Sequence, residues 1–248
     1  MKVLIINDDG FNPAPFELYE ALTKNGFEAK IVLPAGNFSC KSHATGTPCP
    51  SYTDLLDKMV SRQEKHWEKD IPYVVVEGTP VDCFRYALRL YKKIDFVIAG
   101  PNIGLNVGLE TLSSSTVAIA REALSWGKRA IALSVESRAI VQDSKKFLGA
   151  MMTVLVEHMP EEIFLNINIP IGFHNIVFCP LAPANYLDEE YNKERSLSPF
   201  FTEDGDVKLL KSKNITVTPL GIQLYKEFPG QKKLAEELSI LSVFKNGS

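Results

Sequence analysis

The sequence is short of the features that mark several common classes of protein. Its 248 residues hold no long basic run. The 27 Lys and Arg are outnumbered by 30 Asp and Glu, which gives a net charge of −3. No stretch reaches the roughly 18 apolar residues of a membrane-spanning helix, and the first apolar run ends in two aspartates by position 8. We therefore expect no nucleic-acid duplex and no membrane among the partners.

Cysteine pairs and several well-known catalytic motifs are absent as well. GxSxG, GxxxxGK[ST] and a strand-following GxGxxG do not occur, so serine-hydrolase, P-loop and dinucleotide-binding functions lose their main support. Without a CxxC pair or a zinc-like spacing, the cysteines indicate free thiols in a reducing cytoplasm. They stand 9, 34 and 96 residues apart, at Cys40, Cys49, Cys83 and Cys179.

Short apolar runs alternate with helical patterns through the first two thirds of the chain. Helical apolar faces are recognisable over residues 16–22, 81–91 and 117–124. The alternation predicts βαβ units, and therefore an α/β fold with a doubly wound, mostly parallel sheet. The runs expected to form strands are 3–6, 27–33, 73–76, 96–99, 129–135 and 163–169.

Two segments break this rhythm. A polar loop after position 34 continues into the charged stretch 54–70, which fits either an exposed helix or a solvated hairpin. From about position 183 the chain is polar and irregular, before strand-like ITVTPL at 215–220 and amphipathic PGQKKLAEELSILSVF at 229–244. We expect an α/β catalytic core over 1–182 and a C-terminal arm or small subdomain over 183–248, within the same domain or at an oligomer interface.

Polar residues follow the apolar runs at the places where ligands bind in open α/β sheets, outside the carboxyl ends of the strands. Adjacent carboxylates beside hydroxyls and amides favour a hard divalent ion, Mg²⁺ or Mn²⁺, which would also offset the repulsion between the two acids. His43 is the histidine nearest this set in sequence. The set comprises Asn7, Asp8, Asp9 and Gly10, then Asn37, Ser39 and Ser42, then Gly100, Asn102, Gly104, Asn106 and Gly108.

Each part of this set also has a purely structural interpretation. NDDG is a sequence typical of a turn, and Asn102 and Asn106 with their glycines suit a tight loop. Ser114, Ser115 and Thr116 suit a helix N-cap. However, a helix N-terminus that presents hydroxyls also binds phosphate. The coincidence of the three features at one sheet edge favours the functional interpretation.

An ordered series of motifs covers most of the chain: NDDG at 7–10, Asn37 to Ser39 with Ser42, EGTPVDC at 77–83, AGPNIGLNVG at 99–108, STVAIAREA at 115–123, LNINIP at 165–170 and ITVTPL at 215–220. This series resembles the SurE family, the stationary-phase survival proteins that act as metal-dependent nucleotidases and phosphatases. The resemblance implies a Rossmann-like α/β core with a C-terminal arm that helps to build homodimers or homotetramers.

The resemblance also implies a set of site residues. The family's metal ligands fall on Asp8, Asp9, Ser39 and Asn102, and its phosphate-side positions fall on Asn106, Ser114 and Thr116. Ser42 and Ser115 are further candidates for substrate binding.

Three departures from the family pattern bear on substrate fit more than on metal binding. Pro101 stands where an aliphatic residue is usual, and Cys40 replaces a common glycine. Ser113, Ser114 and Ser115 replace the usual tyrosine-serine-glycine.

The function that the resemblance implies is hydrolysis of a nucleoside monophosphate to nucleoside and phosphate. Asp8 and Asp9 would be catalytic by holding one divalent metal ion. Acceptance of a proton from water by Asp9 is a second role, which the sequence does not separate from metal ligation. A receiver-like phosphoacceptor is an alternative, although Gly100, Pro101 and Asn102 stand where its acceptor aspartate is needed. Haloacid-dehalogenase-type phosphatases require a DxD spacing that the adjacent pair does not meet. An inactive metal-binding scaffold is the remaining alternative.

Overall fold

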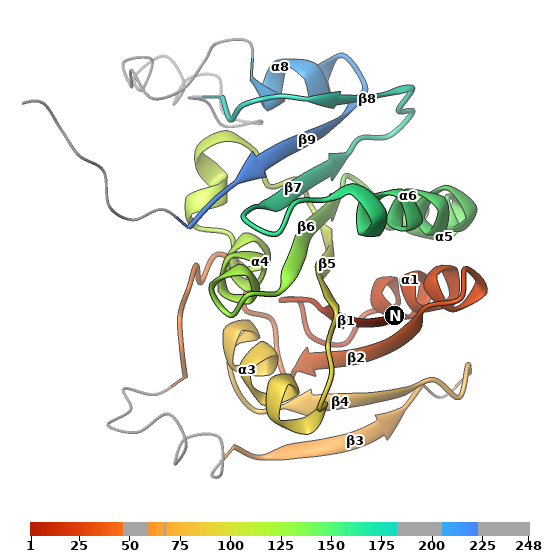
Figure 1. The fold of residues 1–248 in the computed structure, drawn as a ribbon, viewed down its shortest axis with the longest axis vertical. Helices are drawn as coiled ribbons and strands as arrows, with labels where there is room; N and C mark the ends of the chain where they lie inside the picture. The colour runs from red at the N-terminus through yellow and green to blue at the C-terminus, as the bar shows by residue number, and fades with distance from the viewer. Residues whose placement is uncertain (47–58, 67, 183–204, 223–248) are drawn as a thin grey trace, which may run out of the picture.

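One continuous sheet runs through the molecule in the order β3-β4-β2-β1-β5-β6-β7-β9-β8 (Figure 1). The computed structural model describes residues 1–46, 59–66, 68–182 and 205–222. The strands are β1 (Lys2–Ile6), β2 (Glu28–Pro34), β3 (Ser61–Lys65), β4 (Pro72–Val76), β5 (Phe96–Ile103), β6 (Arg129–Val135), β7 (Phe164–Ile169), β8 (Asn175–Phe178) and β9 (Asn214–Leu220).

The six strands from β4 to β7 in the sheet order are parallel to one another, and among the described strands only the flanking pairs β3–β4 and β7–β9 are antiparallel, which confirms the expected α/β fold with a mostly parallel sheet. Along this block the chain proceeds from β1 outward to β2 and β4, then returns to β5 on the other side of β1 and continues to β6 and β7. The direction of winding therefore reverses between β1 and β5. In open α/β sheets the crevice at such a reversal is the usual ligand site.

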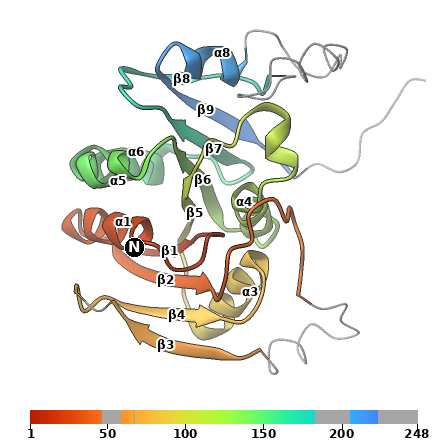
Figure 2. The ribbon, with the colours of Figure 1, turned by 180° about the vertical axis from the view of Figure 1, so that it is seen from behind.

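Helices cover both faces of the sheet, α3 and α4 on one and α1, α5 and α6 on the other (Figure 2). Because both faces are buried, successive residues of β1 such as Leu4 and Ile5 enter opposite cores, and the strand reads as an unbroken apolar run. The helices are α1 (Ala14–Lys24), α3 (Pro80–Leu90), α4 (Ser115–Ser125), α5 (Arg138–Asp143), α6 (Lys145–His158) and α8 (Asp206–Lys211), with a 3₁₀ turn η1 (Gly108–Leu112).

The EGTPVDC motif accounts for the start of α3. Thr79 is the N-cap, and its hydroxyl oxygen accepts the Asp82 N–H at 3.2 Å while Asp82 Oδ2 accepts the Thr79 N–H at 2.9 Å. Pro80 occupies the first helical turn, where its missing N–H costs nothing. This motif therefore fixes a helix N-terminus through a reciprocal capping box.

The structure corrects one expectation for the strands and decides between two alternatives for another segment. The strand expected over 96–99 continues to Ile103, with an irregular register against β6 between Ala99 and Asn102 and a cis peptide at Gly100–Pro101. Asn102 thereby pairs with Ser134 as part of the sheet and is not in a loop beyond it. The charged stretch is no helix over Ser61–Lys65, because β3 pairs antiparallel with β4 as in the hairpin alternative. Residues 54–58 lie outside the described part.

The strand expected over 215–220 is confirmed, and β9 joins the main sheet between β7 and β8. The amphipathic stretch 229–244 lies outside the described residues. Cys40, Cys83 and Cys179 are free thiols, as expected, while Cys49 is not described. Among the helices that the structure describes, none has the length and hydropathy needed to cross a membrane.

Candidate active site

The turn after β1 places two carboxylates at the winding reversal. Asn7 Nδ2 donates to Gly10 O at 2.8 Å and closes the turn. Gly10 has φ +76, and a Cβ on it would lie 3.0 Å from Gly36 O. Only glycine satisfies both the backbone angle and this close approach to the chain leaving β2. The NDDG motif is therefore a turn, and the turn presents Asp8 and Asp9 together.

Asp8 is almost completely buried, at 3% exposed. Thr116 Oγ1 donates to Asp8 Oδ1 at 2.7 Å, and the Thr116 backbone N–H also bonds this carboxylate. Burial raises the pKa of Asp8 to about 6, helped by the charge of Asp9 and opposed by the Thr116 hydrogen bonds. A cation beside this carboxylate would favour its ionised form.

Asp9 links the loops after two neighbouring strands. Its Oδ1 accepts the Ser39 hydroxyl at 3.2 Å and the Asn37 amide at 3.4 Å, and the Ile103 N–H also bonds the carboxylate. Burial raises the pKa of Asp9, although the hydrogen bonds oppose it. The structure thus brings the predicted ligands Asp9 and Ser39 together, beside the end of β5 that carries Asn102.

Asn102 contributes a neutral oxygen at this edge. Its Nδ2 donates to Gly104 O at 2.7 Å, which fixes the amide and leaves Oδ1 as an acceptor. Within the described residues no three His, Cys, Asp or Glu side chains are grouped to hold a metal. The predicted metal ligands include only two carboxylates, and the other two ligands are a hydroxyl and an amide oxygen. Such an all-oxygen set, with two acids held close in a buried turn, fits Mg²⁺ or Mn²⁺.

Asn106 is fixed by two asparagines of β7 that sequence reasoning did not single out. Asn106 N donates to Asn168 Oδ1 at 2.8 Å, and Asn106 O accepts the amides of Asn166 at 2.7 Å and Asn168 at 3.0 Å. Asn106 Nδ2 donates to Ser134 Oγ at 2.8 Å. The available signal was LNINIP, because two asparagines on one side of a buried strand need partners.

The three residues that open α4 have three different partners. Ser114 is the N-cap and its Oγ accepts the Val117 N–H at 3.1 Å. Ser115 Oγ donates to Phe38 O at 2.7 Å and accepts the Lys41 N–H at 3.2 Å. Thr116 bonds Asp8, as described above. The predicted helix cap is present, and it also joins this helix to the loops after β1 and β2.

The candidate substrate-binding residues differ in whether their donor hydrogens are already used in hydrogen bonds within the chain. The hydroxyl hydrogens of Ser115 and Thr116 are used within the chain, and Ser42 donates its own to Leu112 O at 2.9 Å. Among the described residues, Ser114 accepts through its oxygen without donating its hydroxyl hydrogen, and Asn106 donates only one of its two amide hydrogens. Ser114 and Asn106 therefore have donors to offer an anion.

This fold defines an open-sheet α/β protein with a candidate ligand site at the winding reversal, where carboxylate, hydroxyl and amide oxygens suit a divalent cation and hydrogen-bond donors suit an anion. The chain belongs to the SurE family, since residues 3–188 match the family described as Survival protein SurE. The resemblance expected from the motifs is confirmed.

Named relatives and a solved structure agree with this assignment. The 5'-nucleotidase SurE of Carboxydothermus hydrogenoformans is 30% identical, over 90% of this chain and 91% of that protein. The 5'-nucleotidase SurE of Caldanaerobacter subterraneus subsp. tengcongensis is 28% identical, over 94% and 96% respectively. The crystal structure of the SurE protein from Aquifex aeolicus superposes with a TM-score of 0.68 at 25% identity, covering 98% of this chain and all of that one.

Proposed function

We propose that this chain is a 5'-nucleotidase that hydrolyses nucleoside monophosphates to nucleoside and phosphate with one divalent metal ion. Membership of the family and the relatives named 5'-nucleotidase support the reaction. The observation that carries the metal dependence is the acid pair, because two adjacent carboxylates with raised pKa values are stabilised by a cation.

Asp8, Asp9, Ser39 and Asn102 would hold the metal ion, Mg²⁺ or Mn²⁺. When bound, such an ion supplies Lewis acidity to the phosphoryl oxygens and lowers the pKa of its water toward neutrality. The hydrogen bonds from Thr116 fix the orientation of Asp8, and those from Ser39 and Asn37 fix Asp9. The side chains are thus oriented before the ligand arrives.

The remaining steps belong to the chain's own residues. Asp9 is the more exposed acid, and it accepts the proton of the attacking water as the oxygen–phosphorus bond forms. The bond from phosphorus to the nucleoside oxygen breaks and that oxygen takes up a proton from solvent water, while Asp9 afterwards returns its proton to solvent. Asn106 and Ser114 donate hydrogen bonds to phosphoryl oxygens that gain charge. The other candidates act indirectly. Ser42 and Ser115 hold loops in place, and Thr116 orients the Asp8 carboxylate.

The finer properties follow from the same resemblance. We propose a homodimer or homotetramer in the cytoplasm, where the free thiols of Cys40, Cys83 and Cys179 suit a reducing compartment. Of the segment 183–248, α8 and β9 belong to the same domain as the core, because β9 pairs with β7 and β8.

The test is a phosphate-release screen over nucleoside mono-, di- and triphosphates with Mn²⁺, Mg²⁺ or EDTA. We expect the fastest release from monophosphates and none after exhaustive EDTA treatment. A receiver-like module would take up one phosphoryl group per chain without turnover, and an inactive scaffold would bind metal without releasing phosphate. Either result, or full activity in EDTA, would contradict the proposal.

A further inference from the structure

The Ser39 loop, residues 37–46, is tied along its length to distant parts of the chain. Phe38 N donates to Asp8 O at 2.7 Å, and Ser42 N donates to Ser113 O at 2.9 Å. Gly46 N donates to Asp82 Oδ2 at 2.7 Å at the start of α3. The loop therefore passes from the acid pair over the N-termini of α4 and α3.

The loop does not hold this conformation through local preferences. Cys40 has φ 58 and Ser42 has φ 52, both in the left-handed region that costs a non-glycine residue about 1 kcal/mol or more. Two such residues within three positions mean that contacts from elsewhere keep the loop in place.

His43 adds a side-chain hydrogen bond from the centre of the loop to α4, besides the bond from Ser42 Oγ to Leu112 O. His43 Nε2 lies 2.8 Å from Glu122 Oε2 on α4. Glu122 Oε1 accepts Arg85 Nε of α3 at 2.6 Å and Trp126 Nε1 at 3.0 Å. Glu122 is 5% exposed, and α3 and α4 together hold its second oxygen toward the loop.

The protonation of Glu122 fixes the direction of this hydrogen bond. Burial raises the pKa of Glu122, but the hydrogen bonds from His43, Arg85 and Trp126 outweigh it and lower the pKa to about 2. Glu122 is then an ionised carboxylate, which accepts only, so His43 Nε2 must donate. A charge-assisted bond of this kind is stronger than a neutral one.

We propose that His43 is a positioning residue, which holds the Ser39 loop through Glu122 so that Ser39 and Asn37 meet Asp9. His43 touches neither acid, and it acts four positions from Ser39 through the loop backbone. The inference rests on the proposed function for the metal that Ser39 would bind. Residues that orient metal ligands commonly change metal affinity by about 10- to 100-fold when replaced.

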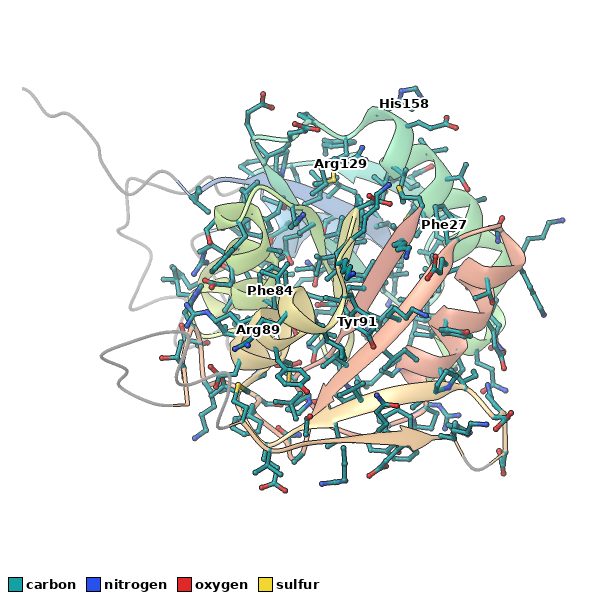
Figure 3. The ribbon with its side chains drawn as sticks, turned by 60° about the horizontal axis from the view of Figure 1, so that its bottom comes forward. Phe27, Phe84, Arg89, Tyr91, Arg129 and His158 are labelled. Carbon is teal, nitrogen blue, oxygen red and sulfur yellow. The ribbon has the colours of Figure 1, made fainter. Side chains whose placement is uncertain are left out.

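The test compares His43→Ala with His43→Gln and with the matched control His158→Ala. His43 is one third exposed, so its removal leaves little buried space. His43→Gln keeps an amide donor near Nε2. His158 is three quarters exposed at the end of α6, far from α3 in the view that labels both Phe84 and His158 (Figure 3). Calorimetric titration with Mn²⁺, amide hydrogen exchange of residues 37–46 and melting temperature are measured on each metal-free protein.

We expect His43→Ala to weaken Mn²⁺ binding by about tenfold or more and to speed amide exchange at Phe38, Ser42 and Gly46. His43→Gln should recover most of both losses, and His158→Ala should match the wild type. Wild-type affinity and exchange in His43→Ala would overturn the proposal. So would a general fall in melting temperature that His43→Gln does not rescue, because that result indicates a role in overall stability alone.

The outcome is separable from the proposed function. If the wild type released no phosphate from any nucleotide, the nucleotidase proposal would fail while the Mn²⁺ titration and the exchange rates still decided the role of His43. If the wild type is active, His43→Ala should lower kcat/KM most at limiting Mn²⁺ and approach the wild type when Mn²⁺ is in excess. Equal losses at limiting and excess Mn²⁺ would contradict positioning through the metal ligands.

Discussion

Asp8 shows how the fold sets the chemistry of a single residue. An apolar strand carries this carboxylate into a buried position, and burial raises its pKa to about 6. The metal-free folded protein therefore binds this proton more tightly than the unfolded chain, whose pKa is near 3.8. Ionisation of Asp8 costs folding free energy unless a cation compensates it.

Without metal, this cost should appear as a pH dependence of stability. It is absent below about pH 4 and fully present above about pH 6, where it reaches about 3 kcal/mol, since one pKa unit is about 1.4 kcal/mol. In EDTA, wild-type stability should therefore fall relative to Asp8→Asn as the pH rises from 4 to 7. Urea unfolding of both proteins at each pH measures the difference, and a difference that stays constant with pH would contradict this assignment.

Cys40 gives a second prediction for one residue. Its φ of 58 explains why glycine suits this position, a point that the sequence comparison could note but not explain. Cys40→Gly removes about 1–2 kcal/mol of strain and adds about 0.5–1 kcal/mol of unfolded-chain entropy, so we expect a net gain of about 0.5–1 kcal/mol. Cys40→Ala, which keeps the Cβ, should gain nothing in the same urea titration. Equal stability of the two variants would exclude strain at this exposed residue.

Helix α4 carries much of the site at the scale of one element. Its first turn caps the helix, holds the Ser39 loop and binds Asp8, through Ser114, Ser115 and Thr116 respectively. The sequence predicted the start of the helix, because capping is local. It could not predict the partners of these hydroxyls, since Phe38 and Asp8 are 77 and 108 residues away.

Substitutions at Thr116 distinguish the role of its hydroxyl from the role of the residue in the packing of α4. Thr116→Val keeps the shape and the backbone N–H but removes the hydroxyl donor to the buried Asp8 carboxylate. It should lower kcat/KM at least tenfold, about 1.4 kcal/mol. Thr116→Ser keeps the hydroxyl and should stay within about threefold of the wild type. Phosphate-release kinetics, normalised to the folded fraction, distinguish the two. Equal rates for the valine and serine variants would show that the hydroxyl does not serve Asp8.

Asp206 connects distant parts at the scale of the whole molecule. This fully buried carboxylate accepts the N–H groups of Gly108 at 2.9 Å, Ala182 at 2.8 Å and Val207 at 3.0 Å. It thus joins the turn after Asn106 to the region beyond β8. The apolar runs predicted the parallel sheet, because a strand buried on both faces is apolar at successive positions. The contacts of Asp206 could not be predicted, because Gly108 and Ala182 lie far from it in the sequence.

Asp206→Ala should destabilise the protein by about 3 kcal/mol or more, because each orphaned buried donor costs about 1–3 kcal/mol. Asp143→Ala, on the exposed face of α5, is the control and should change the free energy of unfolding by about 0.5 kcal/mol or less. Urea unfolding measures both. A loss at Asp206 no larger than at Asp143 would show that this carboxylate does not tie the two regions together.

The central claim is that the acid pair at the winding reversal holds one divalent cation. Calorimetric titration of the metal-free protein with Mn²⁺ tests it without any substrate. We expect one site per chain in the wild type, weakened in Asn102→Ala, which removes a neutral oxygen, and lost in Asp8→Asn, which removes a ligand charge. Wild-type affinity in Asp8→Asn, or no binding by the wild-type protein, would contradict the account.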